Sequence, residues 1–143
     1  MPSLVSIPYN QDSADRTKGE FSKVQSLMIL VAGPYRSGTN DDPALIAENV
    51  AAMTEVSLLL FRLGHLPVMG EWCALPLIAH AGSILRGDPV FEEIFHPITR
   101  RLAAKCDGCL RIGGPSVGAD EMVALAKYHG KAIYHSLDEL PTL

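Results

Sequence analysis

The sequence predicts a three-layer α/β sandwich built on a parallel sheet of about four to five strands. Short apolar runs alternate with longer segments of helical periodicity along the 143 residues. The first run is continuously apolar, which is typical of a strand buried on both faces. Turns rich in glycine follow several of the runs. Strands that alternate with helices pair in parallel and are covered by helices on both faces.

The first half of the chain contains a strand, a long helix and a second strand. Residues 26–32 (SLMILVA) form the continuous apolar run. The long helix is expected over 43–63, because its apolar positions keep helical spacing and a proline occupies its first position. Asp42 is the expected N-cap and Gly64 the stop. Residues 65–69 are the expected second strand.

The second half repeats the alternation. Apolar periodicity, capping residues and glycine stops mark each element. A short turn or helix is expected at the C-terminal end. The expected helices cover 73–81, 89–105 (with a bend at Pro97) and 119–129, and the expected strands cover 108–112 and 131–135.

Composition indicates one small domain in a reducing compartment. We expect residues 26–143 to form the domain and residues 1–25 to be a flexible N-terminal extension. The net charge of −4, with no basic patch, argues against duplex nucleic acid as a partner. The apolar run Val56–Leu63 is too short to span a bilayer, so no membrane association is expected. Three cysteines, an odd number, favour a cytoplasmic location.

Three segments follow predicted strands and are expected to converge. Ligands of parallel α/β sheets bind outside the carboxyl ends of the strands. The segments Gly33–Gly38, Gly70–Trp72 and Gly113–Glu121 all lie at such ends in the predicted order. We therefore expect one site built from all three.

The segment Gly113–Glu121 predicts an anion site beside a carboxylate. A glycine-rich turn before a helix presents backbone N–H groups to an anion, and Gly114, Ser116 and Gly118 are the candidate ligands. Ser116 also suits a plain N-cap. Glu121 is the leading candidate catalytic residue, although an acidic residue early in a helix commonly just complements the helix dipole. Asp120 is interpreted as solvated or as a partner for a sugar hydroxyl.

The turn after the first strand supplies candidate substrate-binding residues. Arg36 carries a planar guanidinium suited to a phosphate or carboxylate, and Tyr35 suits a base or a sugar. Gly33, Ser37 and Gly38 complete the turn. The alternative is a surface turn with a solvated arginine. The glycine spacing does not fit a dinucleotide-binding fingerprint, and a P-loop is excluded because the sequence contains no Gly-Lys-Ser/Thr.

The second strand ends next to Glu71 and Trp72. Glu71 is the second candidate catalytic carboxyl group, and Trp72 suits an aromatic wall or simple packing. Cys106 and Cys109 form a C-x-x-C, but no second pair accompanies them, so two inert thiols are favoured over a zinc or redox site.

The motifs "ILVAGPYRSG" and "GGPSVGADE", separated by a long helix, resemble the nucleoside 2-deoxyribosyltransferase-like superfamily. The resemblance covers roughly residues 27–140 and implies a flavodoxin-like or Rossmann-like sheet. It also implies that Glu121 acts at the anomeric carbon, with Arg36 and Ser116 near a phosphate. The chain departs from the family in the spacing before Glu121 and in lacking an aspartate at the end of the third strand.

The residues and the resemblance together predict cleavage of an N-glycosidic bond, by hydrolysis or base transfer, in a nucleoside or nucleoside 5′-monophosphate. No metal or cofactor is expected. The alternative is a non-catalytic nucleotide-binding or sensing module of the same fold. The resemblance implies a homo-oligomer, a dimer or tetramer, and the helix segment 91–98 is a candidate contact.

Overall fold

The computed structural model describes residues 25–83 and 88–143 and confirms the predicted α/β class. Its four strands form one parallel sheet in the order β2-β1-β3-β4. The expectation of a flexible extension over residues 1–25 falls outside the described residues, apart from residue 25.

The elements follow the predicted alternation, and their boundaries differ from the predicted ones by at most three residues. Each of the four strands is short, and the two central ones are the most deeply buried. The strands are β1 (Met28–Ala32), β2 (Leu66–Val68), β3 (Gly108–Arg111) and β4 (Ala132–Tyr134), and the helices are α2 (Pro43–Arg62), α3 (Gly70–His80), α4 (Pro89–Lys105), α5 (Val117–Tyr128) and the short 3-10 helix η1 (Leu137–Glu139).

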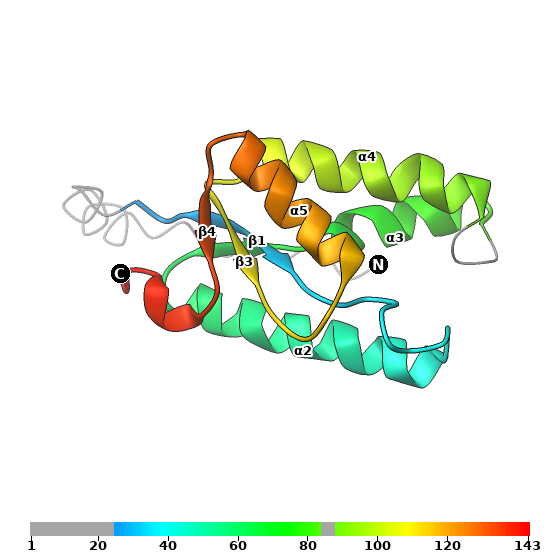
Figure 1. Cartoon of the computed structure of the whole chain (residues 1–143), viewed down its shortest axis with the longest axis horizontal. Helices are drawn as coiled ribbons and strands as arrows, with labels where there is room; N and C mark the ends of the chain where they lie inside the picture. Colours follow the sequence, from blue (N-terminus) through cyan, green and yellow to red (C-terminus); the bar gives the residue numbers. More distant parts are fainter. Residues whose placement is uncertain (1–24, 84–87) are drawn as a thin grey trace, which may run out of the picture.

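The helices cover the sheet unequally. Figure 1 shows α2 on one side of the sheet and α3, α4 and α5 together on the other. Right-handed crossovers require this arrangement, because the chain steps from β1 to one neighbour and then back across to β3. Leu30 of β1 pairs with Val68 on one side and Cys109 on the other. The middle of β1 is therefore fully buried, as its continuous apolar run predicts.

The start of α2 is as predicted. The side chain of Asp42 accepts a hydrogen bond from the backbone N–H of Ala44, and a proline occupies the first turn. At the other end Gly64 adopts a positive φ of 101°, a conformation that glycine tolerates best. Local capping chemistry thus sets both ends of this helix.

The predicted start of α3 at Cys73 is wrong, because the helix begins at Gly70. A Cβ atom at Gly70 would lie 2.7 Å from Cγ2 of Thr99 on α4. Only glycine permits this close approach, so α3 packs against α4 from its first residue. As a result Glu71 and Trp72 belong to the first turn of a helix rather than to a loop.

Candidate functional site

A cleft of about 170 Å³ opens at the carboxyl edge of the sheet. It is bounded by the turn after β1, the start of α3, the first half of α4 and the start of α5. The structure thus brings together the three segments that the sequence analysis expected to converge. The lining residues are Gly33, Tyr35, Arg36, Ser37, Glu71, Phe91, Glu92, Phe95, His96, Ser116, Gly118, Ala119 and Met122.

The turn before α5 presents a helix N-terminus to the cleft. Ser116 is the N-cap of α5, and its hydroxyl accepts a hydrogen bond from the backbone N–H of Ala119 at 3.2 Å. The hydroxyl of Ser37 donates to Ser116 Oγ at 3.1 Å, which joins the turn after β1 to the turn after β3. Backbone N–H groups at the start of a helix and paired hydroxyls form a polar corner suited to an anion.

Arg111, at the end of β3, holds this turn in shape. Its Nη2 donates to the carbonyl oxygen of Gly114 at 2.8 Å, and its Nε donates to Asp120 at 3.0 Å. Its Nη1 also donates to the carbonyl oxygen of Ile112. Only 13% of the Arg111 side chain is exposed, so the guanidinium is part of the turn. The sequence analysis assigned Arg111 no role.

Arg36 lies at the mouth of the cleft with an acidic partner. Its Nε donates to Asp41 at 3.0 Å, and 36% of its side chain is exposed. In the same turn Thr39 is buried, and its hydroxyl donates to the carbonyl oxygen of Arg36 at 2.6 Å. Arg36 therefore has an ordered backbone and a side chain that stays accessible to solvent.

Glu71 is the buried carboxyl group of the cleft. Only 2% of the residue is exposed, and its Oε2 is buried with no hydrogen-bond partner among the described residues. Burial raises the pKa of this carboxyl above its ordinary value of 4.5, and a backbone hydrogen bond offsets part of that rise. An unpaired polar atom in a buried site is costly. A hydrogen bond from a ligand to Glu71 Oε2 would remove this cost.

Glu121, the leading candidate from sequence, lies outside the cleft lining. The buried residues Ala119, Met122 and Ala126 define the inner face of α5. Successive helix residues are about 100° apart, so Met122 faces the cleft while Glu121 is turned toward solvent. Glu121 instead lines a small recess of about 40 Å³ next to the cleft.

Helix α4 contributes an aromatic wall that the sequence analysis did not assign. The ring of Phe95 stacks on Phe91 with centroids 5.1 Å apart, and on Tyr35 with centroids 6.0 Å apart. Such a wall suits a flat or apolar ligand group. On the same helix the carboxyl group of Glu92 contacts the imidazole ring of His96. The spacing i, i+4 of a glutamate and a histidine in a predicted helix was the available signal.

Four of the other predicted residues lie outside the cleft lining. Asp120 is paired with Arg111, and Gly114 supplies a carbonyl to the same arginine. Gly38 is exposed and adopts a positive φ of 73° in its turn. Trp72 is 43% exposed on α3. None of these four residues forms part of the cleft wall.

The two cysteines of the C-x-x-C are buried thiols. Burial raises the pKa of Cys106 to about 11, with a further contribution from the neighbouring Asp107. Burial likewise raises the pKa of Cys109 to about 12, with Cys106 adding to the rise. Both thiols stay protonated at neutral pH and are poor nucleophiles. Within residues 25–83 and 88–143, no group of three or more His, Cys, Asp or Glu residues is placed to hold a metal ion.

No family model matches the chain, and no curated protein matches it. The likeness to the nucleoside 2-deoxyribosyltransferase-like superfamily therefore stays a prediction from the two motifs. What the structure adds is the geometry of the cleft itself.

Proposed function

We propose that the cleft binds a nucleoside 5′-monophosphate and cleaves its N-glycosidic bond. The observation that carries this proposal is a buried carboxyl group, Glu71, in the same small cleft as the N-terminus of α5. A phosphate suits the helix N-terminus together with Ser37 and Ser116. The sugar would then lie toward Glu71. The cleft is smaller than the typical ligand pocket of about 300–1,000 Å³, so a whole nucleotide would extend through its mouth.

In this proposal Glu71 supplies the proton that the leaving base needs. Its raised pKa favours the protonated form, which is the form a general acid requires. As the bond from the anomeric carbon to the base breaks, the Glu71 proton passes to the base and positive charge develops on the sugar. Water, or a second base, then bonds to the anomeric carbon.

Glu92 is the second carboxyl group of the cleft and suits the complementary role. It is paired with His96, and nearly half of its side chain is exposed. In hydrolysis it would accept the proton that the attacking water loses. Glycosidases commonly divide their chemistry in this way between one protonated and one ionised carboxyl group. Glu121 has no step in this scheme.

The test uses chromatography to measure the free base released from a panel of nucleosides and nucleoside 5′-monophosphates. We expect release from at least one monophosphate, with the matching nucleoside reacting more slowly. A monophosphate that raises the melting temperature but is recovered intact would instead support the non-catalytic binding module. That alternative is favoured by one observation, the engagement of Glu92 with His96. If no compound of the panel binds and none releases a base, both functions are contradicted.

A further inference from the structure

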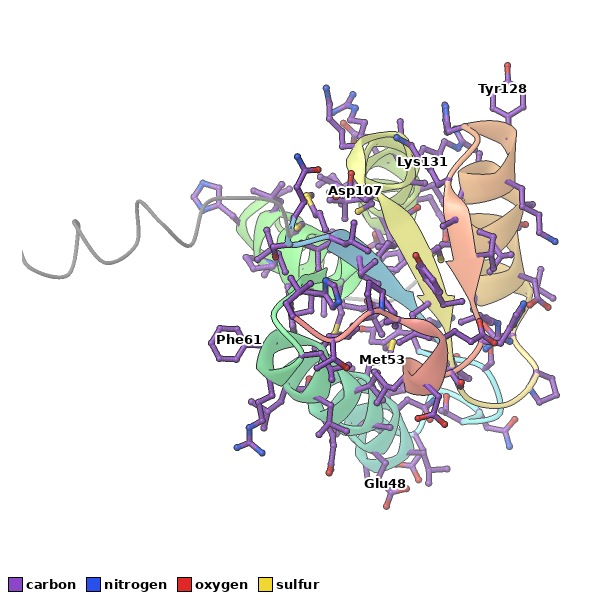
Figure 2. The ribbon with its side chains drawn as sticks, turned by 90° about the vertical axis from the view of Figure 1, so that its left-hand side faces the viewer. Glu48, Met53, Phe61, Asp107, Tyr128 and Lys131 are labelled. Atoms are coloured by element: carbon purple, nitrogen blue, oxygen red, sulfur yellow. The ribbon has the colours of Figure 1, made fainter. Side chains whose placement is uncertain are left out.

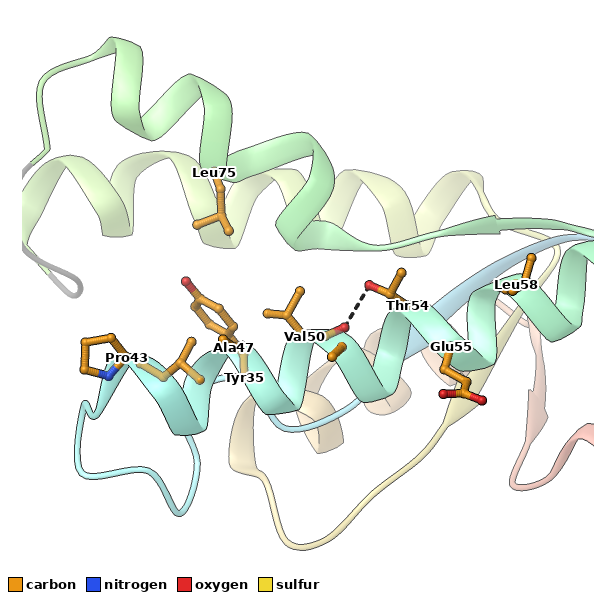
Figure 3. A pocket seen from close by; sticks show the side chains of 10 residues that line it. Tyr35, Pro43, Ala47, Val50, Thr54, Glu55, Leu58 and Leu75 are labelled. Atoms are coloured by element: carbon orange, nitrogen blue, oxygen red, sulfur yellow. Dashed lines mark hydrogen bonds between the residues drawn. The ribbon is translucent and has the colours of Figure 1, made fainter.

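An apolar groove adjoins the candidate cleft. The groove has a volume of about 730 Å³ and lies between α2 and α3. Tyr35 lines both the groove and the cleft. Figure 3 shows its ring between α2 and Leu75 of α3. The ring also stacks on Phe95 of the cleft wall, with centroids 6.0 Å apart. The two spaces are therefore neighbours that share the ring of Tyr35 as a wall.

Helix α2 lines the groove with a side that is neither its buried side nor its charged side. The buried side packs on the sheet through Met53, and Glu48 lies on the charged side. Figure 2 shows Met53 pointing inward and Glu48 pointing away from the fold. Ala47 and Val50 lie on a third side, which lines the groove. By length and composition α2 is also the one helix in the described part of the chain that could cross a membrane, but crossing would remove Met53 from the core.

The polar side chains of the groove leave its interior apolar. The hydroxyl of Thr54 donates to the carbonyl oxygen of Val50 at 2.8 Å, so this donor is used within the helix. Figure 3 shows this bond, and it shows the carboxyl group of Glu55 turned away from α3. Aliphatic side chains such as Ile46 and Leu75 line the rest. These walls suit an alkyl or aryl group, whereas a polar group would lose its bonds to water without replacement.

Two segments lead from the anion-binding corner of the cleft to the groove. In the turn after β1, Ser37 donates to Ser116, and Tyr35 lines the groove two residues earlier. On α3, Leu75 lines the groove one helical turn after Glu71. Residues i and i+4 of a helix lie on one face, with Cβ atoms about 6 Å apart. A ligand that follows both segments passes Glu71 Oε2, which has no hydrogen-bond partner among the described residues, and then enters the groove.

We propose that the groove binds an apolar substituent on the base, so that the substrate is a nucleoside 5′-monophosphate whose base carries an alkyl or aryl group. The inference rests on the proposed function, from which it takes the positions of the phosphate and the sugar. Glu71 gives its proton to the leaving base, so the base lies beside Glu71 and its substituent points toward Leu75. The cleft of about 170 Å³ is too small for a whole nucleotide, whereas the groove has the volume of a typical ligand pocket.

The test is calorimetric titration of the full chain with matched pairs of nucleotides. Adenosine 5′-monophosphate is compared with its N⁶-cyclohexyl derivative, and cytidine 5′-monophosphate with its N⁴-cyclohexyl derivative. We expect the cyclohexyl group to lower Kd by about tenfold or more for at least one base. An oxan-4-yl group, in which an ether oxygen replaces one CH₂ of the ring, should lose most of that gain.

A pair of α2 variants locates the substituent. Ala47→Glu places a carboxylate in the groove and should abolish the gain from the cyclohexyl group. It should change Kd for the unsubstituted nucleotide by less than about threefold, because the plain base does not enter the groove. Ala52→Glu is the matched control, because Ala52 is exposed on α2 outside the groove lining. This variant should keep the gain.

Three results would overturn the inference. They are no gain from the cyclohexyl group with either base, a gain that Ala47→Glu leaves intact, and equal affinity for the cyclohexyl and oxan-4-yl derivatives. The proposed function fails by a different result. A cyclohexyl nucleotide that binds with the expected gain but is recovered intact would remove catalysis and keep the groove as a binding site. Base release from unsubstituted monophosphates, with no gain from the cyclohexyl group, would keep catalysis and remove the groove.

Discussion

Glu71 and Glu121 occupy similar places in the sequence and very different places in the molecule. Each lies near the start of a helix that follows a parallel strand. Glu71 shares the inner face of α3 with Ala74 and Ile78, and it is buried. Glu121 lies about 100° from the inward-facing Met122 of α5 and is exposed. The phase of the helix, and not distance from the strand, decides which carboxyl group reaches the cleft.

The largest expected effect separates the two glutamates by activity. Glu71→Gln keeps the shape and hydrogen-bonding capacity of the side chain but cannot donate a carboxyl proton. We expect it to lower the rate of base release by about 10²–10⁴-fold. Glu121→Gln should change the rate by less than about threefold, because its side chain is outside the cleft. Similar losses in both variants would break the distinction.

The second effect is on stability as a function of pH. The pKa of Glu71 is raised in the folded state, so between pH 4.5 and that raised pKa the folded chain binds more protons than the unfolded chain. The free energy of unfolding contributed by Glu71 therefore falls as pH rises through this window. Urea unfolding from pH 4 to 9 should show wild type losing stability relative to Glu71→Gln. Parallel curves for the two proteins would mean that Glu71 is not protonated by burial.

The third effect concerns the phosphate end of the cleft. Arg36→Gln removes a cation at the mouth and should raise KM for a monophosphate substrate by about tenfold. The matching nucleoside should be affected much less, since it has no phosphate. Arg101→Gln, an exposed arginine on α4 that does not line the cleft, is the control. An equal effect of Arg36→Gln on nucleoside and monophosphate would remove Arg36 from phosphate binding.

The smallest expected effect distinguishes two roles of the serines in the cleft, which are capping of α5 and contact with the ligand. Ser116→Ala removes the N-cap of α5 and should cost about 1 kcal/mol in the free energy of unfolding. Ser37→Ala removes the hydroxyl bonded to Ser116 but leaves the cap in place. We expect Ser37→Ala to lower the free energy of urea unfolding clearly less than Ser116→Ala does, and to weaken phosphate binding about as much. Equal losses of stability would show that Ser37 is mainly structural.

Much of the fold could be predicted because its signals are local. The continuous apolar run of β1 specified a buried central strand, and Asp42 with its following proline specified the start of α2. The start of α3 could not be predicted in the same way. It depends on Gly70 fitting against Thr99, which lies 29 residues further along the chain and belongs to another helix.

The site was predicted at the level of segments and missed at the level of some side chains. Ser116 and Gly118 line the cleft because strand ends and helix starts converge in any sheet of this topology. Arg111 was missed because its bonds to Gly114 and Asp120 depend on the conformation of the turn between β3 and α5, which the residue types alone do not specify. Glu121 was preferred to Glu71 because it follows the glycine-rich turn and matches the glutamate that the resemblance implies, and the sequence did not show that Glu71 is buried and Glu121 exposed.

The most direct measurement follows the carboxyl carbons themselves. The full chain, labelled with ¹³C at the glutamate carboxyl carbons, is titrated with ribose 5-phosphate, which carries the anion and the sugar but has no base to release. Glu71→Gln and Glu121→Gln assign the two signals. We predict a saturable shift of the Glu71 signal with little change at Glu121. A shift of the Glu121 signal while Glu71 stays unchanged would contradict the account.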